Sequence, residues 1–250
     1  AGPGFTGRLR SNDTRMAHII NFAFEVDVLE IHLNELYPVV DKIFICECEI
    51  IHGKSGKRKP NVWDKIKDQP RFSKFQDKVV HFLIKENEIG RSYRYNEWYV
   101  EQTVEEKRWK MFLEWNSQNK FFDEFDIVGF GDVDEIASTY NLNLIKQCET
   151  SSILDVGIWF TRGRITERVK TDWPVKNEPF ALGDPSFFTL QQAKAFPMNM
   201  GNCHKKWFFS ISLIKKVKRH VCNTVGTVAF KIYTIIIFIK NKCKRIRTRI

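Results

Sequence analysis

The order in which apolar and amphipathic runs follow one another constrains the fold of this chain more than any other feature. Five apolar runs have the length and the β-branched or alternating character of buried strands: residues 17–24, 39–50, 78–85, 125–130 and 151–160. Helical patterns separate them, at residues 25–37, 96–115 and 138–149, with a shorter polar helical segment before the third strand. Alternating strands and helices are typical of a mostly parallel sheet covered on both faces. We therefore expect an α/β fold with a mostly parallel central sheet.

Three acidic residues, Asp132, Asp134 and Glu135, directly follow the fourth predicted strand. Ligands of open α/β sheets bind outside the carboxyl ends of the strands, and Gly131 lets the chain turn there. Asp132 and Asp134 are two positions apart, so in extended backbone both carboxylates point the same way and can share one cation. The alternative leaves these acids on a solvated loop, with Asp134 capping the next helix, for which Ser138 is the expected N-cap.

A pair of carboxylates in this place favours a particular chemistry. Hard carboxylate oxygens suit Mg²⁺ or Mn²⁺, and Mg²⁺ is usually held by one or two carboxylates together with substrate phosphates. Such a cation neutralises the charge that builds on a departing nucleoside diphosphate. The sequence contains no glycine-rich phosphate loop, so phosphate binding is expected to depend on the metal.

Two long segments resemble glycosyltransferase family seventeen, whose type activity is that of a β-1,4-mannosyl-glycoprotein 4-β-N-acetylglucosaminyltransferase. They read "FAFEVDVLEIHLNELYPVVDKIFICE" and "FDIVGFGDVDEIAS", and "LDVGIWF" and "TDWPVKNEPFALGDPSFFTL" look like later segments of that family. The matching residues are Glu25, Asp27, Leu29, Glu30, Glu35, Leu36, Val39, Val40, Asp41, Glu47, Asp132, Asp134, Glu135 and Ile136. The resemblance covers residues 19–196 and is far more specific than Asp-x-Asp alone.

The resemblance implies a GT-A-like nucleotide-sugar-binding fold and transfer of N-acetylglucosamine from UDP-N-acetylglucosamine to the core β-mannose of an N-glycan. Transfer from an α-linked donor into a β linkage is inversion, which needs a carboxylate as general base on the acceptor hydroxyl. It further implies a divalent cation, Mn²⁺ or Mg²⁺, and a lumenal Golgi location with a membrane anchor that these residues do not include. A related transferase with another donor or acceptor is the runner-up, and an inactive remnant is a third reading.

The resemblance implies roles in the site for particular residues. Asp132 and Asp134 are the expected metal ligands, with Asp132 also facing the donor; Glu135 and Asp184 are the candidates for the catalytic base. Glu25 and Asp27 follow the first strand, where they either contact the nucleotide or favour the dipole of the next helix. Arg108 either meets the diphosphate or pairs along its helix with Glu101, Glu105 or Glu114, and we favour the pairing.

The sequence departs from the family pattern in three places. His32 stands where the family usually has Arg, and Ala137 where it usually has Pro. From residue 203 to the end the chain has 13 Lys and Arg and no Asp or Glu, and it lacks the acidic, Trp-containing sequence that the family leads us to expect.

The charge of the whole chain, +10, therefore comes from its basic end, because residues 1–202 are mildly acidic. We predict a linker fragment at residues 1–16, a GT-A-like catalytic domain at 17–202 that is incomplete, and a basic tail at 203–250. The composition of the tail suggests translated AT-rich noncoding sequence, which sequencing of the transcript across residue 201 would test. The alternative is a genuine polyanion-binding tail of a nonenzymatic protein. We do not expect nucleic acid to be the partner of the body.

Overall fold

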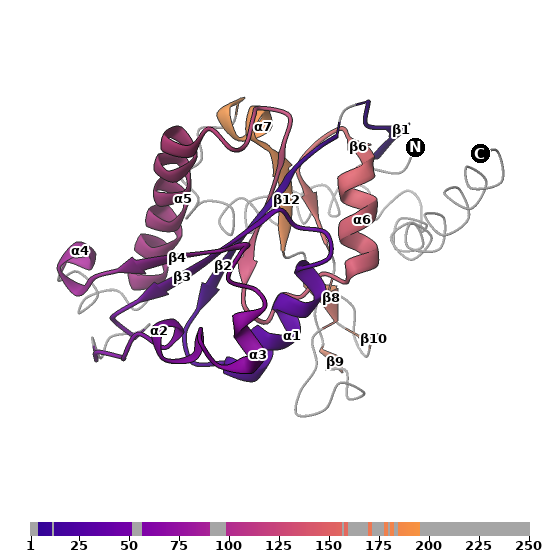
Figure 1. The fold of residues 1–250 in the computed structure, drawn as a ribbon. Helices are drawn as coiled ribbons and strands as arrows, with labels where there is room; N and C mark the ends of the chain where they lie inside the picture. The colour runs from indigo at the N-terminus through magenta and orange to yellow at the C-terminus, as the bar shows by residue number, and fades with distance from the viewer. Residues whose placement is uncertain are drawn as a thin grey trace, which may run out of the picture. The chain divides into compact units, whose positions relative to one another are not determined.

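A six-stranded sheet forms the centre of the protein, with the strand order β4-β3-β2-β5-β12-β7 (Figure 1). Its strands are β2 (Met16–Phe22), β3 (Lys42–Cys48), β4 (Val79–Ile84), β5 (Ile127–Asp132), β7 (Leu154–Asp155) and β12 (Ser186–Thr189). β2 pairs in parallel with β3 and with β5, and β3 pairs in parallel with β4. The predicted mostly parallel sheet of an α/β fold is thus confirmed. β12, which the sequence did not predict as a strand of this sheet, enters antiparallel to both of its neighbours.

The structure is a computed structural model that describes residues 5–11, 13–51, 57–90, 99–156 and 185–195, together with 158–159, 170–171, 178–179 and 181–182. The predicted basic tail, residues 203–250, lies outside these ranges. The predicted fifth strand, residues 151–160, is divided. Its first part is β7, at the edge of the sheet, whereas β8 (Ile158–Trp159) pairs with β11 (Ala181–Leu182) in a separate ladder.

Two more pairs of short strands lie outside the central sheet. β9 (Lys170–Thr171) pairs with β10 (Glu178–Pro179), and β1 (Phe5–Leu9) pairs with β6 (Cys148–Thr150), both antiparallel. β1 falls within residues 1–16, which the sequence assigns to a linker. This part of the expected linker therefore forms a strand that pairs with β6.

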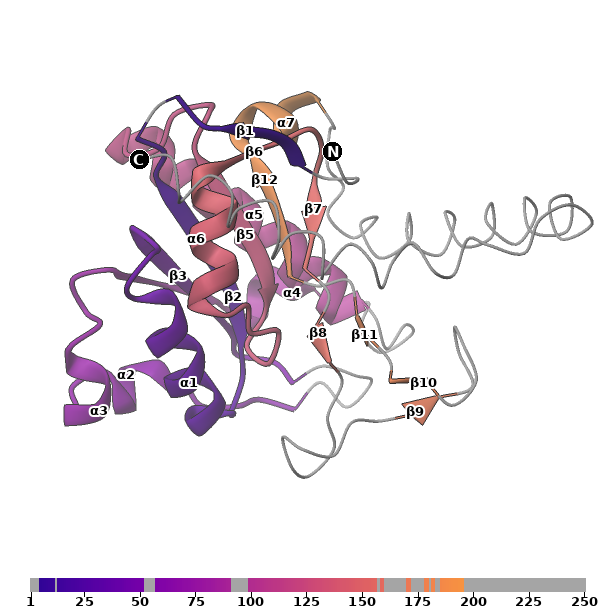
Figure 2. The ribbon, with the colours of Figure 1, turned by 90° about the vertical axis from the view of Figure 1, so that its right-hand side faces the viewer.

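Helices cover both faces of the sheet, as Figures 1 and 2 show. They are α1 (Val26–Leu36), α2 (Trp63–Ile66), α3 (Pro70–Ser73), α4 (Glu86–Ile89), α5 (Tyr99–Asn119), α6 (Thr139–Gln147) and α7 (Leu190–Ala195). α1, α2, α3 and α6 pack on one face, while α4, α5 and α7 pack on the other. α1 places Leu29, Leu33 and Leu36 in the core because their spacing repeats with the helical turn. None of the described helices is both long and apolar enough to cross a membrane.

Two histidines lie buried in the core between β2 and α1. The rings of His18 and His32 meet edge to face, with centroids 5.2 Å apart, and neither side chain is exposed to solvent. Nδ1 of His32 donates to the carbonyl oxygen of Val133 at 2.9 Å, which ties α1 to the segment after β5. Burial lowers the pKa of both histidines, that of His32 to about 4. Both rings are therefore neutral at pH 7.

The neighbour of His18 on β5 has to be a glycine. His18 lies opposite Gly129 in the parallel register, and a Cβ on Gly129 would stand 2.3 Å from Nδ1 of His18 and 2.7 Å from the ring of Phe187. Contacts this short do not occur in folded proteins, so the absence of a side chain is what allows β2, β5 and β12 to close around the imidazole.

A buried ion pair supports the carboxyl end of β3. Glu47 and Lys59 are both buried, with 3.0 Å between Oε1 and Nζ. Lys59 Nζ also donates to the carbonyl oxygen of Ala23, in the loop that leaves β2, at 3.2 Å. The ammonium group therefore connects the ends of two neighbouring strands.

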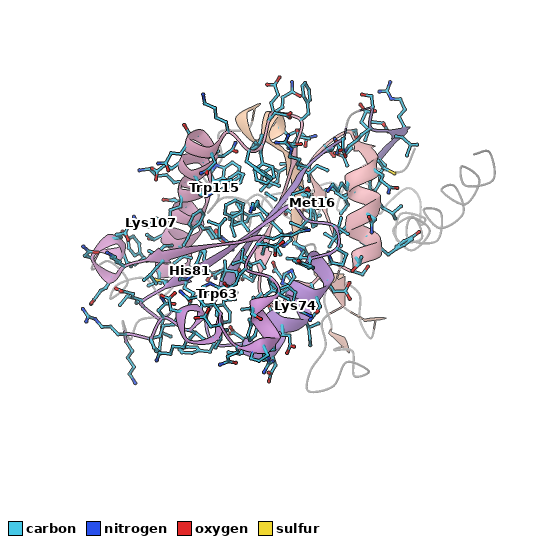
Figure 3. All side chains as sticks on the ribbon, viewed as in Figure 1. Met16, Trp63, Lys74, His81, Lys107 and Trp115 are labelled. Carbon is cyan, nitrogen blue, oxygen red and sulfur yellow. The ribbon has the colours of Figure 1, made fainter. Side chains whose placement is uncertain are left out.

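Both oxygens of the Glu47 carboxylate also accept hydrogen bonds from other groups. It accepts hydrogen bonds from the backbone of Val62 and Trp63, both at 2.9 Å, and from Nε2 of His81 at 3.0 Å. Figure 3 shows Trp63 and His81 side by side beneath the strands. Burial alone would raise the pKa of Glu47, but these hydrogen bonds and the charge of Lys59 outweigh it and the pKa lies below its usual value.

The buried histidines make stability depend on pH. In the unfolded chain the His32 imidazole binds a proton near pH 6.5, whereas in the folded chain it does so only near its lowered pKa of about 4. The free energy of unfolding therefore falls as the pH falls from about 6.5 to about 4. We expect the free energy of unfolding to drop by roughly 2 kcal/mol through His32 between pH 8 and pH 5, with His18 lowering it further in the same direction, measured by urea titration. His32→Gln, which keeps an N–H donor for Val133, should weaken this dependence. An unchanged pH dependence in that variant would contradict the account.

The ion pair of Glu47 and Lys59 should be costly to break. Lys59→Met leaves Glu47 without its cation, and we expect a loss of about 3–5 kcal/mol in the free energy of unfolding. The matched control is Lys67→Met, which removes a lysine from an exposed pair with Asp64 and should cost about 1 kcal/mol or less. Equal losses in the two variants, measured by urea unfolding at pH 7.5, would show that the buried pair has no special role.

Candidate functional site

The carboxyl ends of β2 and β5 lie side by side, with Asn21 opposite Asp132 in the parallel register. β2 is the first strand of the parallel set; the chain then adds β3 and β4 on one side of it and returns to add β5 on the other. A crevice for ligands forms where the direction of strand addition reverses. In this sheet that place is between the ends of β2 and β5 (Figure 2).

Asp132 is the last residue of β5 and reaches this edge. Its side chain is 45% exposed, and its Oδ1 lies 3.5 Å from Nη1 of Arg108. Its backbone N–H donates to Oε2 of Glu135 at 2.7 Å, and the next N–H, that of Val133, donates to the carbonyl oxygen of Asn21 at 3.0 Å. The backbone that carries Asp132 is thus fixed on both sides, while the carboxylate still reaches solvent.

Asp134 lies at the surface two residues further on. Partial loss of hydration raises the pKa of its carboxyl group, and the negative charges of Asp132 and Glu25 raise it further. We call Asp132, Asp134 and Glu25 the acidic edge. Repulsion between like charges at this edge would be relieved by a bound cation.

The alternative role of Asp134 as a helix cap is wrong. The N-cap of α6 is Ser138, as its sequence predicts, and its side chain accepts from the backbone N–H of Asn141 at 3.3 Å. Helix capping therefore does not account for the acid at position 134.

Glu25 and Asp27 have different partners in the structure. Glu25 closes the loop after β2, because its Oε2 accepts from the backbone N–H groups of Ala23 at 3.3 Å and Phe24 at 2.8 Å. We include it in the acidic edge because its negative charge raises the pKa of Asp134. Asp27, whose side chain is 87% exposed, instead pairs with Arg71 of α3 at 2.6 Å and is not brought to that edge by any contact described.

Of the two candidates for the base, the structure describes one. Glu135 folds back onto the end of β5, where Oε2 holds the N–H of Asp132. A Cβ on Gly131 would stand 2.8 Å from that oxygen and 2.7 Å from Cβ of Pro185, so glycine makes room for this turn. Asp184 lies outside the described residues.

Arg108 does not lie as expected. The guanidinium group, for which we favoured pairing along α5 with Glu101, Glu105 or Glu114, points to β5 and donates from Nη1 to the carbonyl oxygen of Gly131 at 2.8 Å. Arg108 and Gly131 are more than 20 positions apart in the sequence, so no local pattern predicts their contact. The contacts of Lys59 with Ala23 and of His32 with Val133 also join distant positions, and the sequence did not suggest them.

The donor set fits a divalent cation that is shared with a phosphate. Among the described residues there is no group of three or more His, Cys, Asp and Glu side chains arranged to hold a metal ion by themselves. Two solvent-accessible carboxylates, such as those of Asp132 and Asp134, are sufficient for Mg²⁺ or Mn²⁺ when substrate phosphates complete the coordination. A cavity of about 410 Å³ lies at the opposite, amino end of the strands and is lined by residues that include Arg10, Val39 and Lys146, none of them from the acidic edge.

Comparisons with known proteins bear on this site. A search of curated proteins returns no match. Among solved structures, the chain is similar to a crystal structure of 4-diphosphocytidyl-2C-methyl-D-erythritol synthase, with 15% identity and a TM-score of 0.36, over 71% of this chain and 76% of that one. A likeness at this level carries no argument. The model of glycosyltransferase family 17 matches residues 5–158, which run from β1 through β7 to the first residue of β8 and include the whole acidic edge. The match covers more than half of the chain, which is therefore a glycosyltransferase and belongs to family 17.

Proposed function

We propose that this glycosyltransferase moves N-acetylglucosamine from UDP-N-acetylglucosamine to the core β-mannose of an N-glycan, with inversion and with a divalent cation at the acidic edge. Family membership implies a nucleotide-sugar donor and a glycan acceptor. N-acetylglucosamine, the β-mannose acceptor and a lumenal Golgi location come from the family resemblance. The single observation that carries the metal-dependent part is the placement of two solvent-accessible carboxylates, Asp132 and Asp134, at the switch point of the sheet.

In this mechanism the carboxylates of Asp132 and Asp134 would hold Mn²⁺ or Mg²⁺ against the diphosphate of the donor. The cation would neutralise the charge of the departing UDP. Glu25 adds negative charge from the end of β2, and its own hydrogen bonds fix the loop along which the nucleotide would lie. The support for a GT-A-like arrangement is the parallel order β4-β3-β2-β5 with the acids at the end of its last strand.

We assign the general base to Asp184 rather than to Glu135. Oε2 of Glu135 already holds the backbone of Asp132, so proton abstraction by Glu135 would disturb the metal-binding turn. Pro185, the neighbour of Asp184 in the chain, lies against Gly131 at the same edge. Asp184→Asn should therefore lower kcat by about 100-fold or more while UDP binding is unchanged. If Asp184→Asn transfers the sugar at the normal rate and Glu135→Gln does not, the assignment is reversed.

Calorimetric titration of UDP into the full chain tests the metal site. We expect tight binding with Mn²⁺, weak binding without it, and a loss of at least about 100-fold in Asp134→Asn, because one of two protein ligands is gone. The control is Asp77→Asn, an exposed acid close to the amino end of β4, which should bind UDP as the unsubstituted chain does. Tight binding of UDP by Asp134→Asn, or no response to Mn²⁺ in the folded chain, would contradict the proposal.

The transfer itself needs a separate assay. The full chain should form a β-1,4-linked product from UDP-N-acetylglucosamine and an N-glycan with an exposed core mannose. UDP binding without any product from this donor would support the metal site and point to another donor or acceptor within the same family.

A further inference from the structure

One cationic side chain contacts the last three residues of β5. Arg108 on α5 donates from Nη1 to the carbonyl oxygen of Gly131 at 2.8 Å, and the same atom lies 3.5 Å from Oδ1 of Asp132. The centre of its guanidinium group is 3.8 Å from the centroid of the Phe130 ring. A planar guanidinium with its fixed fork of donors can hydrogen-bond a carbonyl and a carboxylate while its flat face stacks on an aromatic ring.

Burial determines which role Arg108 can have. Its side chain is 2% exposed, and Nε is buried without a hydrogen-bond partner. A diphosphate in the solvent-facing crevice could not touch this side chain unless α5 moved. The part of the site that Arg108 does reach is Asp132, which is itself 45% exposed.

We propose that Arg108 is a positioning residue that holds the Asp132 carboxylate and the end of β5 in place for the cation and does not itself touch the donor. This inference rests on the proposed function, because it takes Asp132 to be a metal ligand. The guanidinium charge offsets part of the repulsion between Asp132 and Asp134 before the cation arrives. The contact also restricts the Asp132 side chain to one orientation, in which its second oxygen is free for the cation.

The experiment compares Arg108→Met and Arg108→Lys with Lys110→Met in the full chain. Lys110 is on the same helix, is 77% exposed, and its removal changes the net charge by the same amount. Binding of Mn²⁺ in the presence of UDP is followed by electron paramagnetic resonance. We expect affinity for Mn²⁺ to fall about 10- to 100-fold in Arg108→Met, to be partly recovered in Arg108→Lys, and to be unchanged in Lys110→Met.

A second measurement separates positioning through Asp132 from a general effect on folding. In the metal-free chain, Asp132→Asn should lower the melting temperature because the buried guanidinium loses its carboxylate. The same substitution should have little effect in the chain that already carries Arg108→Met. Melting temperatures that change additively would show that the two residues act independently and would overturn the inference.

Two further outcomes distinguish failure of this inference from failure of the proposed function. If the unsubstituted chain binds Mn²⁺ with UDP and Arg108→Met binds it equally well, the inference is wrong and the proposed function stands. If the unsubstituted, folded chain binds no Mn²⁺ with UDP, the proposed function fails and the inference fails with it.

Discussion

The parallel pairing of β2 with β5 is the constraint on which the rest of the structure depends. It makes β2 a central strand buried on both faces, and it brings the loop after β2 next to the acids that end β5. The pairing requires Gly129, since any side chain there would collide with His18 and Phe187. The last pair of the register, Asn21 with Asp132, is the pair from which the candidate site is built.

Charge at the edge of the sheet is arranged in two layers. Beneath the surface, Arg108 and Lys59 are buried cations held by Asp132 and Glu47, and both also donate to backbone carbonyls at the ends of strands. At the surface, Asp134 and Glu25 extend the negative charge into solvent. Buried charges with fixed partners hold the backbone, while the exposed carboxylates are left to bind. This division is what a site for a cation and a diphosphate needs, because the ligands must stay in position before the substrate arrives.

Features that depend on neighbours in the sequence could be predicted, whereas features that depend on distant contacts could not. The spacing of leucines in α1, the apolar strands β2 to β5 and the cap at Ser138 are local, and the structure has them. The place of the acids also followed from local order, because a strand ends where they begin. β12 was missed because its antiparallel pairing depends on a return of the chain some 50 residues after β5. The direction of Arg108 was missed for a related reason: pairing one turn away along a helix is the local expectation, and only packing of α5 on the sheet turns the side chain to Gly131.

The proposed function depends on a cation that binds between Asp132 and Asp134 and is also coordinated by the diphosphate of the donor. Anomalous diffraction from crystals of the full chain grown with Mn²⁺ and UDP tests it most directly. We expect a manganese peak within coordination distance of both carboxylates, at the end of β5 beside β2, with the UDP phosphates on its other side. A manganese ion elsewhere, or UDP bound at another edge of the sheet without a metal, would contradict it.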